Sequence, residues 1–181
     1  MPAKHIALAP PVHDLERQAI RFIVDGLPDS YTVYSNAWLV ERTGAVYELD
    51  AIVAAPHALY VVEIKSYRGE VQGNDNDWWI PEAIRSPLRL NRRTAQVLAS
   101  ALRHANFDAG AAWVEGLVFL SHTTDVRVTG PASQGRVHTR RTLLEELQNP
   151  GPLKARAGRL SLPPVSPQTL AVLHQLLSGA D

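Results

Sequence analysis

The chain contains no cysteine, and this absence removes several kinds of chemistry at once. Thiol catalysis, disulfide bonds and cysteine–zinc sites are excluded. The sequence also lacks an apolar run of the roughly 20 residues that cross a bilayer, and no signal-peptide pattern opens it. We therefore expect a cytoplasmic protein with no membrane partner.

The chain also has no net charge, because 18 Lys and Arg residues balance 18 Asp and Glu residues. This balance argues against a protein that coats nucleic acid by bulk electrostatics, although it is compatible with a local basic groove. The sequence has no Walker-type loop, no Gly-x-Ser-x-Gly motif and no metal-ligand spacing among its seven histidines. Nucleotide hydrolysis and serine-hydrolase chemistry are therefore not indicated.

The most informative segment is a predicted β-hairpin that carries acids on both strands. Two β-rich runs flank the breaker Pro56-His57. A turn centred there places Asp50 opposite Glu63 and Glu48 opposite Lys65. Strand side chains alternate between faces, so these four share one face of the sheet. The other face is the predicted core, formed by Leu49, Ala51, Val53, Tyr60, Val62 and Ile64.

Two readings of this acidic pair are open. Directly opposed strand residues have Cβ atoms about 4.5–5.5 Å apart, and like charges at that distance repel. Asp50 and Glu63 therefore favour a shared proton or a bound cation. In the simpler alternative, the charges form a solvated strand end, and Glu48 and Lys65 make an ordinary cross-strand ion pair.

A first helix is predicted from Asp14, as its cap, to about Asp25, where Gly26 and Pro28 stop it. Glu16 lies at the edge of the apolar stripe of this helix. An acid at that position points either to water or towards the cluster of Asp50 and Glu63.

A second helix is predicted from Ser86-Pro87 to about His104. Its polar face is either a phosphate-contacting surface or an ordinary solvated face; it consists of Arg89, Arg92, Arg93 and Gln96. The pair Trp78-Trp79 is compatible with a core lid and with a stacking platform for bases.

The remaining elements complete an α/β pattern with a mixed β-sheet flanked by helices. Residues 1–12 form a lead-in and residues 151–167 a loop. The predicted strands and helices are Tyr31–Val40, Glu70–Gln72 and Gly116–Ser121, then Arg140–Leu147 and Gln168–Leu177.

These residues resemble the nuclease-related, or NERD, domain, a branch of the PD-(D/E)xK nuclease superfamily. The resemblance covers about residues 12–150. It rests on Glu16, Glu48-Leu49-Asp50, Val61-Val-Glu-Ile-Lys-Ser66, Gly69-Glu-Val71, the following tryptophan and Ser86-Pro-Leu88. Many family members carry Asn-Pro-x-x-Gln where this chain has Ser86-Pro-Leu-Arg-Leu90, so Gln96 is the substitute candidate for the missing amide.

The resemblance implies a restriction-endonuclease-like core in a single domain over residues 1–181, with a helical extension at residues 166–178. It implies a Mg²⁺- or Mn²⁺-dependent site for hydrolysis of DNA phosphodiesters. Asp50, Glu63 and Glu16 would bind metal, and Lys65 would orient or deprotonate the attacking water, the latter with a lowered pKa. The narrower resemblance is to the amino-terminal module of large kinases in bacterial phage-defence systems of the BREX/Pgl type, which makes a fused kinase and other defence proteins expected partners.

Two other functional classes remain open from the sequence. The domain could bind DNA without cutting it, or it could serve as a protein-interaction and regulatory module of a fused kinase. The presence of Glu16, Asp50, Glu63 and Lys65 together favours the enzyme, because a binding surface gains little from buried like charges.

Overall fold

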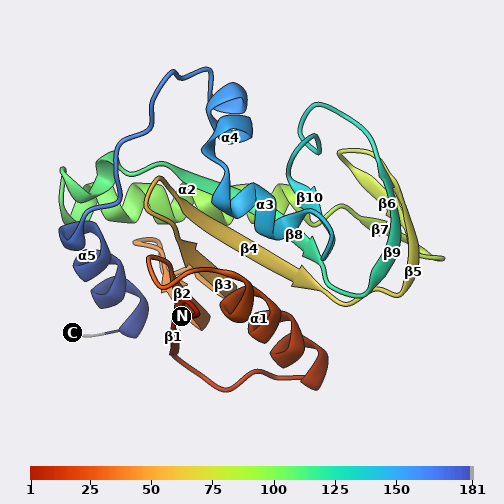
Figure 1. Ribbon diagram of the computed structural model, residues 1–181, viewed down its shortest axis with the longest axis horizontal. Coiled ribbons are helices and arrows are strands. Elements are labelled where there is room, and N and C mark those ends of the chain that lie inside the picture. Colours follow the sequence, from red (N-terminus) through yellow and green to blue (C-terminus); the bar gives the residue numbers. More distant parts are fainter. Residues whose placement is uncertain (180–181) are drawn as a thin grey trace.

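A six-stranded mixed sheet forms the centre of the α/β molecule (Figure 1). The computed structural model describes residues 1–179. Strands β2, β3 and β4 are antiparallel neighbours, whereas β1 runs parallel to β2, and β8 runs parallel to both β4 and β10. In spatial order the strands are β1 (Lys4–Ala7), β2 (Thr32–Val40), β3 (Val46–Ala54), β4 (Leu59–Lys65), β8 (Val114–Leu120) and β10 (Val137–His138).

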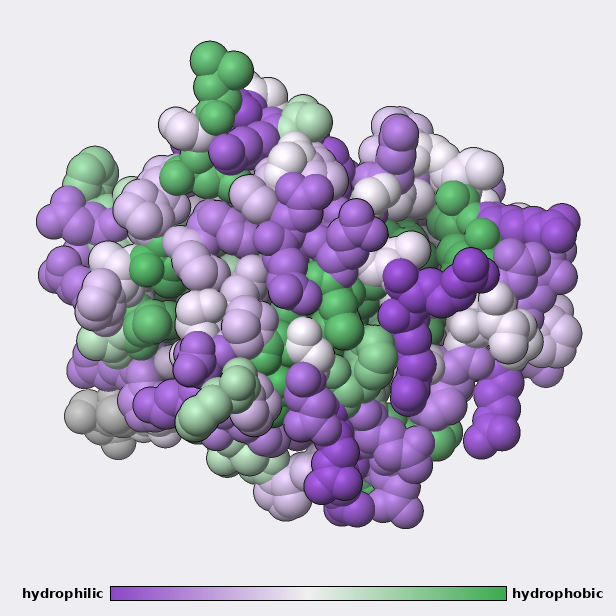
Figure 2. Space-filling view, in the orientation of Figure 1, coloured by the Kyte–Doolittle hydropathy of each residue, from purple (hydrophilic) through white to green (hydrophobic). Residues whose placement is uncertain are grey.

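Helices cover both faces of this sheet. One face packs against α1 (Asp14–Gly26), α3 (Leu143–Gln148) and α4 (Pro150–Ala157). The other packs against α2 (Leu88–Ala105) and α5 (Pro167–Ser178). Figure 2 shows the first face in the orientation of Figure 1: most of it is hydrophilic, and hydrophobic residues are visible in the middle, over the sheet.

A second, four-stranded sheet lies beside the C-terminal ends of β4 and β8. Its order is β7 (Ala83–Arg85), β6 (Asp77–Trp79), β5 (Gly69–Gly73) and β9 (Thr123–Val128). The core between the sheets contains Trp78, which is fully buried, together with Val118 and Leu120. Trp79 is 47% exposed, so only the first tryptophan of the pair acts as a core residue.

The predicted register of the central hairpin is confirmed. Ala54 pairs with Leu59 and Ala51 with Val62, which is the alignment that a turn at Pro56-His57 requires. The alternation of side chains along β3, however, is interrupted at Asp50. Ala51 and Val53 belong to the core on the α1 face, as predicted, but Leu49 belongs to the core on the α2 face.

The neighbouring strand β2 contains the matching irregularity at Asn36, which has a φ of 54°. Val33 faces the α1 side, whereas Tyr34, Ala37 and Leu39 all belong to the core on the α2 side. Strict alternation would place Tyr34 and Ala37 on opposite faces. Both strands therefore change faces near the same point, and this brings Trp38 and Asn36 into the pocket that carries the acids.

Other elements differ from the sequence-based predictions. Residues 151–167, predicted as a loop, contain most of α4, and the helix predicted from Arg140 begins at Leu143. Asp14 does not cap α1, because His13 occupies the cap position without a side-chain hydrogen bond. The lead-in contains β1, and strands β6, β7, β9 and β10 were not predicted. Among residues 1–179 there is no helix with the length and apolar character that spanning a bilayer demands.

Candidate active site

The candidate site lies where β3 and β4 separate. Their pairing ends at Ala51 and Val62, after which β4 continues along β8 as far as Lys65 and β3 continues along β2 as far as Val46. A pocket of about 390 Å³ occupies this fork. Its polar lining comes from α1, β2, β3 and β4 and includes Glu16, Asn36, Glu48, Asp50, Glu63 and Lys65. The structure thus gathers all four of the predicted catalytic residues into one pocket.

Asp50 is the most perturbed group in the pocket. Its Oδ2 atom accepts a hydrogen bond from the backbone N–H of Ile64 at 2.8 Å. Burial, followed by repulsion from Glu63 and a smaller repulsion from Glu16, raises the pKa of Asp50 to about 7, against the stabilising effects of the Ile64 hydrogen bond and the Lys65 charge. A carboxyl group in this environment favours either a proton or a cation.

Glu16 reaches the acidic pocket from the first turn of α1. Its Oε1 atom accepts a hydrogen bond from Nδ2 of Asn36 at 2.9 Å, and its Oε2 atom accepts one from the backbone N–H of Val12 at 3.1 Å. Of the two orientations open from the sequence, the structure has the one directed towards Asp50 and Glu63.

Lys65 forms an ion pair with Glu63, with 3.2 Å between Nζ and Oε1. The alternative pair between Glu48 and Lys65 is not formed, because β4 has already separated from β3 at this point. Burial opposes the ammonium charge, but attraction to Glu63 and the hydrogen bond with it outweigh this effect, so the pKa of Lys65 is raised. Without a metal ion, Glu63 thus favours the ammonium form of Lys65, and a lowered pKa beside a bound metal stays a prediction.

Asn36 is the pocket residue that the sequence analysis missed. Its amide nitrogen donates to Glu16, and its Oδ1 atom is buried without a hydrogen-bond partner among residues 1–179. An asparagine in the middle of an otherwise apolar and β-rich run was the available signal, because asparagine is among the few residues that tolerate the left-handed region.

The donor set suits a hard divalent cation, although no group of three His, Cys, Asp or Glu side chains within residues 1–179 is arranged to hold one. Carboxylate and amide oxygens are the ligands that Mg²⁺ accepts, and Mg²⁺ keeps several waters. The raised pKa of Asp50 indicates that the surrounding residues do not fully compensate its negative charge. The Oδ1 atom of Asn36 has no hydrogen-bond donor among residues 1–179.

The four predicted DNA-contacting residues lie outside this pocket. Arg89, Arg92, Arg93 and Gln96 line a separate groove on α2, together with Asp75, Glu115 and Arg136. Arg93 points to the end of the β2–β3 hairpin, where its Nη2 atom lies 3.4 Å from Oε1 of Glu41. Within the described residues, Arg89 and Arg92 form no ion pair, so they are the free cations of this groove.

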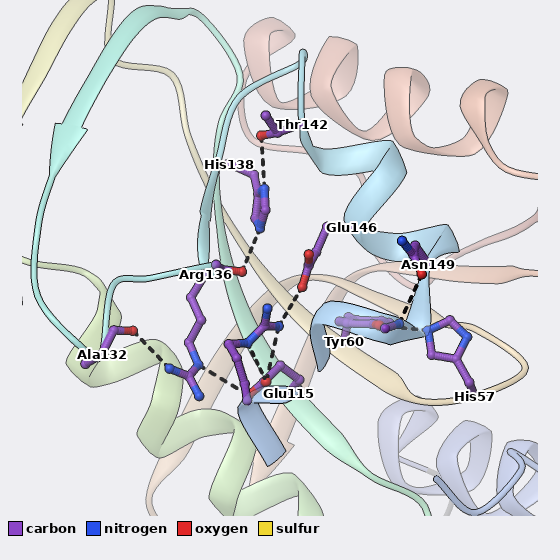
Figure 3. A network of polar contacts seen from close by, with 12 residues as sticks. His57, Tyr60, Glu115, Ala132, Arg136, His138, Thr142, Glu146 and Asn149 are labelled. Atoms are coloured by element: carbon purple, nitrogen blue, oxygen red, sulfur yellow. Dashed lines mark hydrogen bonds and ion pairs between the residues drawn. The ribbon is translucent and has the colours of Figure 1, made fainter. Parts of the chain in front are cut away.

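A buried ion-pair network lies beside this groove (Figure 3). Glu115 in β8 binds two arginines, with 3.5 Å to Nε of Arg136 and 3.4 Å to Nη2 of Arg156, and Arg156 also pairs with Glu146 at 2.6 Å. His138 donates from Nε2 to the carbonyl oxygen of Gly135 and accepts at Nδ1 from the hydroxyl of Thr142. Burial lowers the pKa of His138, in keeping with a neutral ring. This network links α3 and α4 to the sheet.

Comparison with known proteins adds three findings. The model of the nuclease-related domain matches residues 12–121. A protein named probable kinase PglW, from Streptomyces coelicolor, is 32% identical over 142 residues, which cover 74% of this chain and 9% of that protein. No solved structure matches the chain significantly. Because the family match covers more than half of the sequence and includes Glu16, Asp50, Glu63 and Lys65, this chain belongs to the nuclease-related domain family.

Proposed function

We propose that the chain is a metal-dependent nuclease domain with a restriction-endonuclease-like core, and that it hydrolyses DNA phosphodiesters. One observation carries this proposal: a single pocket contains three carboxylates and a lysine, namely Asp50, Glu63, Glu16 and Lys65. Repelling carboxylates are costly to maintain in a partly buried site unless a ligand compensates them. A structural role alone gives no reason for three of them.

In this proposal Asp50 and Glu63 would hold one Mg²⁺ or Mn²⁺ ion, and Glu16 would either complete the ligand set or orient a water at the ion. When bound, the ion lowers the pKa of a water and stabilises negative charge on the scissile phosphate.

Lys65 presents an ammonium group beside Glu63, so we assign it the role of a hydrogen-bond donor and positive charge. It orients the attacking water or holds a non-bridging phosphate oxygen. The other pocket carboxylate, Glu48, is exposed to solvent.

We further propose that Arg89 and Arg92, with Gln96 and Arg93, contact the DNA backbone away from the cut. Phosphate contacts position DNA without reading its sequence. Arg93 is the weakest member of this set because Glu41 already neutralises it.

The decisive experiment is a cleavage assay on supercoiled, linear and single-stranded DNA with Mg²⁺, Mn²⁺ or EDTA. The proposal expects cleavage that needs the divalent ion and that Asp50→Asn abolishes. Asp108→Asn is a matched control, because Asp108 is an exposed carboxylate whose side chain makes no hydrogen bond among the described residues. If both variants cut as the wild type does, the pocket is not the active site.

A second candidate function is a non-cleaving DNA-binding or regulatory module of a larger phage-defence kinase. The observation that favours it is the match to a protein named as a probable kinase, of which this chain matches only 9%. No cleavage under any divalent ion, with DNA retarded in gels, would support the binding module; absence of DNA affinity would support the regulatory one.

A further inference from the structure

Asn36 occupies an unusual backbone position for a strand residue. Its φ of 54° lies in the left-handed region, while its neighbours pair normally: Ser35 with Ala51 and Ala37 with Leu49. The left-handed conformation is unfavourable for most L-residues, and asparagine is one of the residues that adopt it most readily. The strand keeps this distortion directly opposite Asp50, which lies between the two paired positions.

The left-handed backbone at Asn36 changes which side chains of β2 face the pocket. Residues 37 and 39 face the α2 core in place of residue 38, so Trp38 and Asn36 line the acidic pocket. With regular alternation continued from Tyr34, Asn36 would face α2, away from Glu16. The irregular backbone is thus what brings the amide group to the carboxylates.

The two polar atoms of the Asn36 amide differ in their hydrogen bonds. The Nδ2 atom donates to Oε1 of Glu16 at 2.9 Å, whereas the Oδ1 atom is buried and has no partner within residues 1–179. A buried acceptor left without a hydrogen bond destabilises the folded protein. A pocket that receives a cation or its bound water would satisfy this acceptor.

We propose that Asn36 belongs to the divalent-cation site: its amide N–H group holds Glu16 in place, and its Oδ1 atom is a neutral oxygen donor to Mg²⁺ or Mn²⁺ or to a water that the ion binds. This inference rests on the proposed function. It adds to the acidic set a neutral ligand from β2, so the site draws on α1 and three neighbouring strands.

The test measures Mn²⁺ binding by the electron paramagnetic resonance signal of the free ion, which requires no activity. Asn36→Gly keeps a residue that adopts positive φ freely but removes both amide functions. Loss of a group that supports a metal site commonly weakens metal affinity by about 10–100-fold, and we expect a loss of at least tenfold here. A backbone role alone would be fulfilled by glycine, so unchanged Mn²⁺ affinity in Asn36→Gly overturns the inference.

Asn36→Asp separates the two amide functions. It keeps a side-chain oxygen and the tolerance for positive φ, but it cannot donate to Glu16 while it is ionised. If Oδ1 serves the ion, this variant binds Mn²⁺ at least as tightly as the wild type; a tenfold weaker affinity shows that only the donation to Glu16 matters and overturns the ligand assignment. Thermal unfolding in EDTA verifies the fold of each variant, and Asn36→Asp provides the test if Asn36→Gly does not fold.

The wild type separates failure of this inference from failure of the proposed function. If the wild type binds no Mn²⁺, both are overturned. If the wild type binds Mn²⁺ and Asn36→Gly binds it equally well, the metal site stands and only the role of Asn36 is lost.

Discussion

The Oδ2 atom of Asp50 accepts a hydrogen bond from the backbone N–H of Ile64, 2.8 Å away, at the point where their strands part. A side chain here replaces the backbone acceptor that a continued ladder would have supplied. The bond fixes the orientation of the carboxyl group and holds the two arms of the fork together at their base.

In the metal-free protein, the contribution of Asp50 to stability is expected to decrease as the pH rises. The pKa of Asp50 is about 7 in the folded state and ordinarily 3.8, so folding favours its protonated form. The stabilising effect of the bound proton is therefore fully present below about pH 4 and is lost as the pH rises to about 7. At about 1.4 kcal/mol per pKa unit, the loss amounts to a few kcal/mol.

Urea unfolding in EDTA at pH 5 and pH 8 measures this loss. Asp50→Asn removes the charge but retains an oxygen that accepts from Ile64. This variant should therefore be more stable than the wild type at pH 8, and the difference should be smaller at pH 5. Parallel pH profiles for the two proteins would contradict the assignment of the titration to Asp50.

Lys65→Met is expected to lower the cleavage rate by about 10²–10³-fold while the protein stays folded. Methionine keeps an unbranched apolar side chain but removes the ammonium group beside Glu63. Removal of one charge-stabilising donor commonly lowers kcat by about 10²–10³-fold. Single-turnover cleavage at saturating Mg²⁺ is the measurement, and Lys4→Met, on the exposed strand β1, is the control. A Lys65→Met rate within a fewfold of the wild-type rate would remove Lys65 from the site.

Arg89→Ala and Arg92→Ala should each weaken DNA binding and reduce its salt dependence. Each phosphate contact that is lost lowers the slope of log K against log salt by about 0.9. Fluorescence anisotropy with DNA measures this slope between about 50 and 200 mM salt, without divalent ions, because the affinity falls steeply with salt over this range. Arg127→Ala is the matched control, because Arg127 is exposed on β9 and already pairs with Glu70 and Asp125. An unchanged slope in both α2 variants would place the DNA path elsewhere.

Glu115→Gln should destabilise the protein without changing Mn²⁺ affinity. Glu115 is buried and binds both Arg136 and Arg156, so its loss leaves buried guanidinium groups undercompensated. Breaking such a pair costs about 3–5 kcal/mol. Glu70→Gln, which breaks an exposed pair, should cost about 1 kcal/mol or less. Equal unfolding free energies for the two variants, from urea titrations, would show that the network contributes little.

The sequence predicted the central hairpin well because its signals are local and agree with one another. Pro56-His57 marks the turn, and the apolar residues of both strands constrain the register, since a slip by one residue would move every side chain to the other face. Long elements such as α2 and α5 were found for the same reason: their apolar periodicity extends over several turns.

The missed elements are short or have contradictory local signals. Strands β6, β7 and β10 contain two or three residues, too few to display a period. Helix α4 begins Pro-Gly-Pro, which is typical of a loop, yet Asn149 caps it through the N–H of Gly151, and Leu153 anchors it in the core. The face change at Asn36 involves the pairing of two strands, and its one local sign is the asparagine inside a β-rich run, which does not by itself define the faces.

The fork between β3 and β4 divides the pocket between two mechanical units. Asn36 and Asp50 are carried by the arm formed by β2 and β3, and Glu63 and Lys65 by the arm formed by β4 and β8. Beyond the Asp50–Ile64 hydrogen bond no ladder connects the arms, so a change in their relative twist alters the spacing of the carboxylates directly. The tip of the first arm carries the exposed side chains of Val40 and Val46, which pair across the hairpin. Because Glu41 at this tip pairs with Arg93, helix α2 is tied to the arm that carries Asn36 and Asp50.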